Sequence, residues 1–280
     1  MMSNQALLNG VVCDSPLKDD RALHFGDGLF ETLAIVNGEP CLWDRHFLRL
    51  KKGCEQLKIT PPEQTLLQAE SRQLCQNVER GVLKIIISAG HAERGYARSK
   101  STPVTRLLMT GDWPKAAPYK NSEPVTLGLC EMRLGSQPYL AGIKHLNRIE
   151  QVMARKELAT DYFEGIMLNQ KGLVIEGIMS NLLVQQDGKF VTPSIVDCGV
   201  DGVMRSLMLD IAKKNHVHIN IEEVSLEQFR DADQIYVMNS LLGVRPVSCF
   251  EQREFQSNHI TPEWLDAVNT AGFNAETGSL

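Results

Sequence analysis

The chain has 280 residues, of which 43% are hydrophobic and 22% charged, enough apolar material for two modest domains or one large one. A net charge of -5 gives no basic surface for nucleic acid or an anionic membrane, and no apolar run reaches the roughly 18 residues of a membrane span. The seven cysteines contain no Cys-x-x-Cys pair, which argues against a disulfide framework and a zinc site. We therefore expect a cytoplasmic globular protein with no nucleic-acid partner, no membrane partner and no metal.

The N-terminal half combines predicted strands with two predicted helices. The strands are β-branched or alternating runs bounded by turn residues, and they cover 7–13, 28–36, 81–88 and 104–110. Asn37-Gly38 is the signal for a hairpin after the second strand. The two helices are predicted to begin at polar caps, Asp44 and Thr60.

A linker is predicted at 113–123, because three prolines and no apolar periodicity occur between residues 111 and 124. We expect a small N-terminal α/β domain over 1–112 and a larger C-terminal domain over 124–280. The predicted connections include both hairpin turns, at 169–172 and 187–188, and strand–helix–strand connections. The expected fold class is therefore α+β (mixed α/β), with two domains that are each a mixed sheet with packed helices.

Lys144 lies between a glycine-containing loop and an apolar-periodic segment. The apolar residues after it recur at spacings of three and four: Leu146, Ile149, Val152 and Met153. This spacing predicts an amphipathic helix whose apolar stripe faces a core. A lysine beside a core is partly desolvated, which favours the neutral, nucleophilic amine that can form a Schiff base. Most lysines near a helix start only extend into water, so Lys144 alone decides nothing.

Three further features, with Lys144, are what pyridoxal 5'-phosphate needs from a protein. Arg49 on a helix could bind the phosphate. The free N–H groups at the helix start Gly202–Met204 could form a phosphate cup. Glu176 at a strand end could keep the ring nitrogen protonated. Each has an ordinary alternative, namely a surface cation, a plain helix start and a solvated acid at a hairpin end.

Five segments together, in this order and spacing, resemble the fold-type IV family of pyridoxal-phosphate enzymes over essentially the full chain. They are Phe25-Gly26-Asp27-Gly28-Leu29-Phe30-Glu31-Thr32, His46-Phe47-Leu48-Arg49-Leu50, Gly142-Ile143-Lys144, Val174-Ile175-Glu176-Gly177 with Ser180-Asn181, and Gly202-Val203-Met204-Arg205. The resemblance implies that Lys144 is the Schiff-base lysine and that Glu176 is the partner of the pyridinium nitrogen. It also implies a set of phosphate-binding groups: Arg49, the amides of Val203 and Met204, and Ser240.

Within this family the segment Ala141–Arg148 and the loop Arg94-Gly95-Tyr96 are most similar to the aminodeoxychorismate lyases. Branched-chain aminotransferases have a Gly-Asn-Tyr pattern after the lysine, and D-amino-acid aminotransferases have serine at the place of His145 and tyrosine at that of Phe30. The resemblance implies a homodimer that converts 4-amino-4-deoxychorismate into p-aminobenzoate and pyruvate in folate biosynthesis. One departure is Met204, which replaces the threonine of many relatives.

The same resemblance implies that Lys144 is the general base and that Lys144 or Thr32 donates the proton to the leaving group. Further residues are expected to contact the substrate: Phe30, Arg94, Tyr96, Arg98 and His145. Two alternatives stay open. One is a D-amino-acid or branched-chain aminotransferase on the same scaffold, and the other is a pyridoxal-phosphate-binding protein without catalytic activity.

Overall fold

The computed structural model describes residues 6–12, 20–91, 95–98, 102–115, 123–255 and 263–274. Its contacts divide the chain into two compact units. The first unit comprises 1–114, 143–147 and 273–280, and the second comprises 115–142 and 148–272. The segment around Lys144 thus belongs to the first unit. Most of the predicted linker 113–123 lies outside the described residues, and the predicted domain boundaries stay a prediction.

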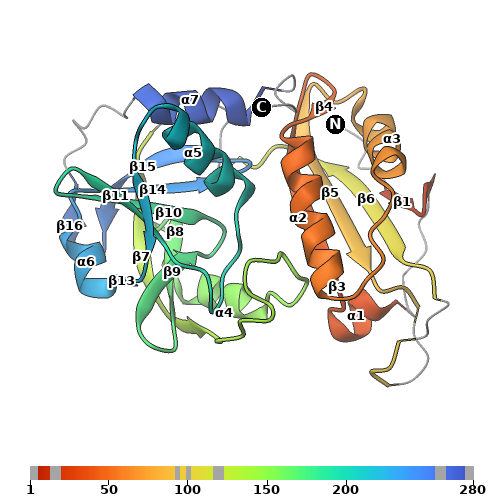
Figure 1. Cartoon of the computed structure of the whole chain (residues 1–280), viewed down its shortest axis with the longest axis horizontal. Helices are drawn as coiled ribbons and strands as arrows, with labels where there is room; N and C mark the ends of the chain where they lie inside the picture. Colours follow the sequence, from red (N-terminus) through yellow and green to blue (C-terminus); the bar gives the residue numbers. More distant parts are fainter. Residues whose placement is uncertain are drawn as a thin grey trace. The chain divides into compact units, whose positions relative to one another are not determined.

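The first unit contains a six-stranded sheet with strand order β2-β1-β6-β5-β3-β4. Its elements are β1 (Ala6–Leu8), β2 (Val11–Val12), α1 (Arg21–Phe25), β3 (Gly28–Val36), β4 (Glu39–Pro40), α2 (Trp43–Gln56), α3 (Gln64–Cys75), β5 (Arg80–Ser88) and β6 (Thr105–Gly111). Every described pair of these strands is antiparallel, so the mixed sheet expected here is not found. Helix α2 runs across one face of this sheet (Figure 1).

Alternation along β3 separates the two faces of this sheet. Leu29, Glu31 and Leu33 are buried, whereas Phe30 and Thr32 are partly exposed. The buried face packs against α2, where a Cβ added at Gly53 would lie 2.8 Å from the Leu29 side chain. The absence of a side chain at Gly53 lets the helix approach β3 closely.

The helix starts of this unit differ from the predicted ones. Helix α2 begins at Trp43 after Leu42, and the predicted cap Asp44 lies inside its first turn. Helix α3 begins at Gln64 rather than after Thr60. A residue that precedes proline disfavours the helical conformation, and the pair Pro61-Pro62 therefore delays the start of α3.

The second unit contains a ten-stranded mixed sheet with path order β12-β11-β10-β14-β15-β7-β8-β9-β13, and β16 pairs with β15. Its strands are β7 (Val125–Leu134), β8 (Glu164–Asn169), β9 (Leu173–Gly177), β10 (Asn181–Gln186), β11 (Lys189–Pro193), β12 (Ile219–Glu222), β13 (Val224–Ser225), β14 (Gln234–Asn239), β15 (Gly243–Phe250) and β16 (Arg253–Glu254). Its helices are α4 (Ile149–Glu157), α5 (Val203–Lys214), α6 (Leu226–Asp231) and α7 (Glu263–Gly272). The predicted hairpins at 169–172 and 187–188 join β8 to β9 and β10 to β11.

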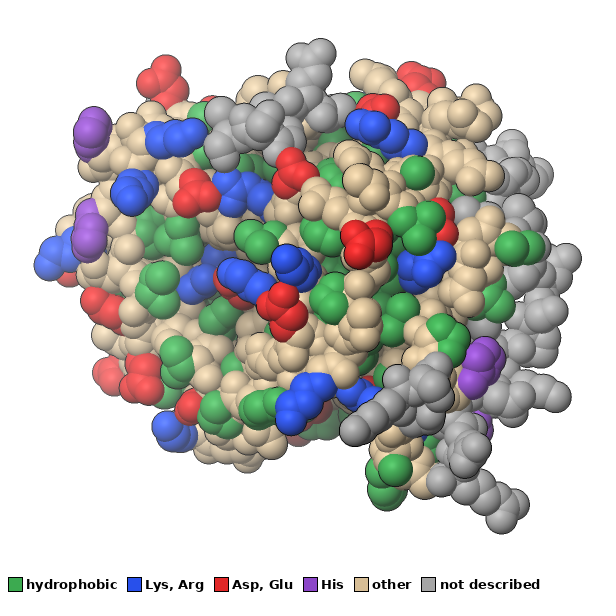
Figure 2. Space-filling view, turned by 45° about the vertical axis from the view of Figure 1, so that its right-hand side comes forward, with side chains coloured by type: hydrophobic (Ala, Val, Ile, Leu, Met, Phe, Trp, Pro, Cys, Tyr) green, Lys and Arg blue, Asp and Glu red, His purple; other side chains and the backbone are tan. Residues whose placement is uncertain are grey.

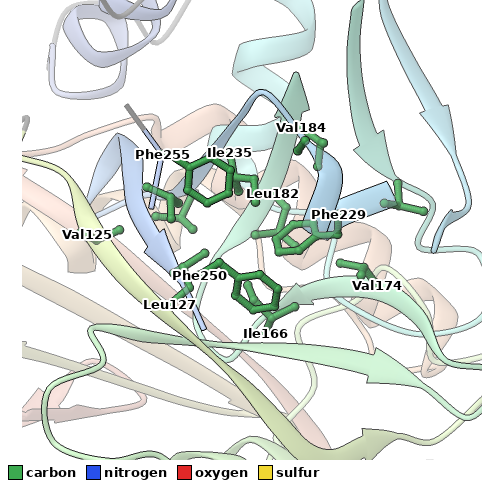
Figure 3. Packing of buried hydrophobic residues seen from close by; sticks show 14 of the residues in the cluster. Val125, Leu127, Ile166, Val174, Leu182, Val184, Phe229, Ile235, Phe250 and Phe255 are labelled. Carbon is green, nitrogen blue, oxygen red and sulfur yellow. The ribbon is translucent and has the colours of Figure 1, made fainter. Parts of the chain in front are cut away.

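A cluster of buried aliphatic and aromatic side chains forms the main core of the second unit (Figure 3). At its centre the rings of Phe229 and Phe250 meet edge to face, with centroids 5.0 Å apart. Phe229 comes from α6 and Phe250 from the end of β15. This contact therefore fastens the short helix α6 to the sheet.

The apolar stripe predicted after Lys144 does not face a core. The side chains of Ile149, Val152 and Met153 are 68%, 49% and 40% exposed, and the residues of α4 that are buried are Gln151 and Ala154. The periodicity indicated the helix correctly but assigned its apolar side to the wrong environment. The small Ala154 faces the sheet instead, because β7 passes close to this helix.

On the face shown in Figure 2, basic and acidic side chains are interspersed with no extended area of one charge. Within the described residues, no helix is long and apolar enough to span a membrane.

Replacing Phe229 by alanine should lower the free energy of unfolding by about 3–5 kcal/mol, because truncation of a buried ring leaves a cavity that the surrounding side chains fill only in part. Urea unfolding followed by circular dichroism would measure the change. The control Val196→Ala removes methyl groups from a side chain that is 70% exposed, and it should change this free energy by less than about 0.5 kcal/mol. Equal effects of the two substitutions would contradict the assigned core.

Candidate active site

Backbone hydrogen bonds fix the lysine segment against the start of β3. Phe30 N donates to Lys144 O at 3.0 Å, and Leu146 N donates to Gly28 O at 3.0 Å. Between them Leu29 and His145 form an antiparallel bridge. Residues 144–146 therefore behave as a short extra strand rather than as the first turn of a helix, and α4 begins only at Ile149. The backbone of Lys144 is thus bonded to β3 through its carbonyl oxygen.

The side chain of Lys144 extends over an aromatic ring. Its Nζ lies 4.5 Å from the centroid of the Phe30 ring, and the residue is partly buried. An ammonium group at this distance is attracted by the ring quadrupole. Phe30 and Thr32 are two positions apart in β3 and so face the same side of the sheet. The predicted Schiff-base lysine and the two predicted neighbours thus lie on one surface.

On the opposite side of β3, Glu31 forms a buried network with α2. Glu31 is 1% exposed, and it accepts two hydrogen bonds from the Arg49 guanidinium, from Nε at 2.8 Å and from Nη2 at 2.5 Å. The Nδ1 atom of His46 lies 2.6 Å from the second carboxylate oxygen. His46 and Arg49 are three positions apart in α2, a spacing that places both on one side of the helix.

The charges in this network determine its protonation. Burial alone would raise the pKa of Glu31, but the charge of Arg49 and the hydrogen bonds from Arg49 and His46 lower this pKa to about 2. For His46, burial lowers the pKa, and the nearby charges of Arg49 and Lys144 act in the same direction, against the raising effect of Glu31. The Glu31 carboxylate thus orients the Arg49 guanidinium, and the His46 imidazole beside them is neutral.

Within the second unit, Val200, in the loop before α5, is hydrogen-bonded to both Glu176 and Asn181. Val200 N donates to Glu176 Oε2 at 2.8 Å, and Asn181 Nδ2 donates to Val200 O at 2.9 Å. Gly142, two positions before Lys144, forms a parallel bridge with Val200. Glu176 is only 4% exposed, so the solvated acid considered as an alternative is not observed.

Helix α5 begins directly after this loop, and Gly202 is its N-cap without a side-chain cap. A Cβ added at Gly202 would lie 1.8 Å from Asn181 Oδ1, so only glycine fits there. The amides of Val203 and Met204 are at the free N-terminus of the helix, where the backbone favours an anion. The Met204 side chain packs near Gly272 of α7, which leaves its backbone N–H as its polar group. Ser240 follows the end of β14.

Beneath the turn that connects Glu176 to Asn181 lies a second buried acid, Glu164. Its Oε2 accepts hydrogen bonds from Ser180 Oγ at 2.9 Å and from Met179 N at 3.3 Å. Burial raises the pKa of Glu164 to about 7, against the lowering effect of its hydrogen bonds. Glu164 thus supports the turn that holds the predicted pyridinium partner.

The predicted substrate-binding loop is only partly described. Arg94 lies outside the described residues. Arg98 forms an ion pair with Asp27, with a hydrogen bond from Nε to Oδ2 of 2.9 Å. Tyr96 is 85% exposed, and its carbonyl accepts a hydrogen bond of 2.9 Å from the buried Arg21. The roles of these residues in substrate binding stay predictions.

Sequence reasoning did not single out Glu31 or His46, although both stand in the segments that carry the family resemblance. The spacing of three between His46 and Arg49 on a helix, and an acid at a buried position of an alternating strand, were the signals that could have found them.

Replacing Glu31 by glutamine should lower the free energy of unfolding at pH 7 by roughly 3 kcal/mol, because Arg49 loses its buried counter-charge. The folded pKa of Glu31, about 2, is depressed from 4.5, so the stabilisation exists above pH 4.5 and is lost as the pH falls toward 2. Urea unfolding at pH 7 and pH 3 should show a smaller difference between wild type and variant at the lower pH. The exposed Glu63→Gln serves as control, and a difference independent of pH would refute this assignment.

The chain is similar to known proteins over most of its length. A model of the family described as amino-transferase class IV matches residues 28–250. The aminodeoxychorismate lyase of Vibrio harveyi is 36% identical over 231 residues, which are 82% of this chain and 85% of that protein. The crystal structure of 4-amino-4-deoxychorismate lyase from Pseudomonas aeruginosa superimposes with a TM-score of 0.89 and 37% identity, covering 95% of this chain and 98% of that one.

The fold extends to more distant proteins. The pyridoxal-phosphate-bound form of a hypothetical aminotransferase from Mycobacterium tuberculosis has a TM-score of 0.79 and 21% identity, and the match covers 96% of this chain and 99% of that one. The predicted fold class, two units built of sheets with packed helices in the manner of fold type IV, is confirmed. Since the family model and the relatives match most of its length, the chain belongs to the amino-transferase class IV family.

Proposed function

We propose that the chain is a pyridoxal-phosphate-dependent aminodeoxychorismate lyase, which converts 4-amino-4-deoxychorismate into p-aminobenzoate and pyruvate. The similarity to two lyases of this name, at 36% and 37% identity over most of both chains, supports the reaction. The observation that carries the proposal is the placement of Lys144, whose backbone is bonded to β3 and whose amine lies over Phe30.

Residues of both units would contribute to binding pyridoxal phosphate. In the first unit the Lys144 amine would hold the aldehyde and Arg49, oriented by Glu31, would bind the phosphate. In the second unit Glu176 would bind the ring nitrogen, and the amides of Val203 and Met204 would bind the phosphate. Ser240 is a further proposed phosphate ligand.

When bound, pyridoxal phosphate supplies an electron sink for the carbon that bears the substrate nitrogen. The protein must then move protons at defined atoms. Lys144 removes the proton from that carbon as general base, and the carboxylate of Glu176 keeps the sink electron-poor. Loss of the enolpyruvyl oxygen from the neighbouring carbon makes the six-membered ring aromatic. Lys144 or Thr32 donates the proton to the departing group, and His145 orients the reacting groups.

The purified protein loaded with pyridoxal phosphate should release pyruvate from 4-amino-4-deoxychorismate without any added 2-oxo acid. Lactate dehydrogenase coupling measures the pyruvate, and chromatography measures the p-aminobenzoate. Turnover that depends on a 2-oxo acid would instead identify an aminotransferase on the same scaffold, and loaded protein without either reaction would indicate a binding protein.

Replacing Lys144 by alanine should lower the rate of pyruvate release by at least about 10³-fold, since both the base and the aldehyde anchor are removed. The variant should keep its melting temperature within a few degrees, because the bonds of residue 144 to β3 use the backbone. Lys52→Ala, an exposed lysine in α2, is the matched control and should keep full activity. Undiminished turnover by the Lys144 variant would exclude the proposed role.

We also propose that the protein is a cytoplasmic homodimer. The exposed apolar residues of α4, Ile149, Val152 and Met153, form a surface that a second copy could cover, since exposed apolar patches of this kind mark interaction sites. The pairing of two identical chains is the commonest way to cover such a surface.

Val152→Asp should raise the dimer dissociation constant at least about tenfold by placing a charge in the covered surface. Light scattering after size exclusion would compare its mass with that of the 31.3 kDa chain. Val196→Asp, at an exposed position outside α4, is the control and should leave the mass of the wild type unchanged. A monomeric wild type, or a variant with unaltered association, would refute this interface.

A further inference from the structure

The proposed substrate carries two carboxylates, and the described cations that were expected to bind them are engaged elsewhere. Arg98 pairs with Asp27 and also donates to the carbonyl of Lys58 at 3.2 Å. Two donors of Arg49 are directed at Glu31, and this arginine is already assigned to the cofactor phosphate. A further cation on the same surface as Lys144 would supply a partner for one of these carboxylates. This inference rests on the proposed function and concerns the substrate part of the same site.

Lys84 in β5 occupies such a position. It lies directly opposite Thr32 in the antiparallel pairing of β3 with β5, and Phe30 lies opposite Ile86. Residues opposite each other in an antiparallel pair project to the same face. Phe30, Thr32 and Lys84 are therefore on one face of the sheet, and it is the face that α2 does not cover.

The ammonium group of Lys84 meets the same ring as that of Lys144. Lys84 Nζ lies 5.5 Å from the centroid of Phe30, and Lys144 Nζ lies 4.5 Å from it. Within the part of the chain that the structure describes, Lys84 forms no ion pair with a carboxylate, and its contact with Phe30 is its only specific side-chain interaction. Two ammonium groups beside one ring repel each other, and an anion bound between or next to them relieves this repulsion.

We propose that Lys84 binds one of the two carboxylates of the substrate. The Phe30 ring positions the side chains of both Lys84 and Lys144. The flexible methylene chain of a lysine can lie along an apolar surface while its ammonium group stays in water, where it can bind an anion. A carboxylate held by Lys84 brings the carbon that carries the substrate nitrogen toward Lys144.

The test uses the loaded full-length protein and three variants, Lys84→Gln, Lys84→Arg and the control Lys52→Gln on the exposed side of α2. For Lys84→Gln we expect a rise of at least about 30-fold in the KM for 4-amino-4-deoxychorismate and a change in kcat below about threefold, since a charge-assisted contact to the substrate is lost. Lys84→Arg should stay within about fivefold of the wild-type KM, and Lys52→Gln should be unchanged. The visible absorbance of the loaded cofactor should be the same in all variants.

A binding measurement separates recognition from turnover. Chorismate keeps both carboxylates but has a hydroxyl in place of the amine, and calorimetric titration should show at least tenfold weaker binding of chorismate to Lys84→Gln than to the wild type. An unchanged KM and unchanged chorismate binding in Lys84→Gln would overturn the proposal, as would an equal loss of cofactor absorbance and kcat. If the wild type itself releases no pyruvate, the proposed function fails, and that result is distinct from failure of the role of Lys84.

Discussion

The short stretch of backbone pairing between residues 144–146 and the start of β3 is the constraint on which the candidate site depends. Its two hydrogen bonds use main-chain atoms of Lys144 and Leu146, so the lysine side chain is left to extend over the Phe30 ring. A lysine on an unpaired loop would have to order both its backbone and its side chain at each reaction. Here the backbone is fixed in advance, which is the sense in which the site is pre-organised.

β3 serves the site through both of its faces. The odd-numbered position Glu31 turns toward α2 and orients Arg49, whereas Phe30 and Thr32 turn to the other side, toward Lys144 and Lys84. In the second unit, one residue likewise contacts two parts of the site. Val200 bonds to Glu176 with its N–H and to Asn181 with its carbonyl, and so a carboxylate and a helix N-terminus are held at a fixed separation. In both units, a few backbone atoms determine where the charged groups lie.

The sequence predicted most strands and the turns between them, because alternation and signals such as Asp187-Gly188 are local. The sequence-based predictions were wrong or incomplete where contacts between distant parts of the chain determine the environment of a residue. The stripe of Ile149 and Val152 has helical spacing but is exposed, and no local signal distinguishes an apolar side that meets a core from one that meets solvent or a partner. Glu31 and Lys84 were not singled out, because their roles arise from pairing between strands and helices distant in the chain. Lys144 and Glu176 were singled out from their local sequence, but only the resemblance of whole segments gave each of them a role.

Mass spectrometry of the protein after reduction with borohydride tests the central claim most directly. The account predicts that the loaded protein, once reduced and digested, yields a peptide in which the side chain of Lys144 carries the added mass of a phosphopyridoxyl group. Modification confined to another lysine, for example Lys84, or a protein that gains no such mass after incubation with pyridoxal phosphate, would contradict it.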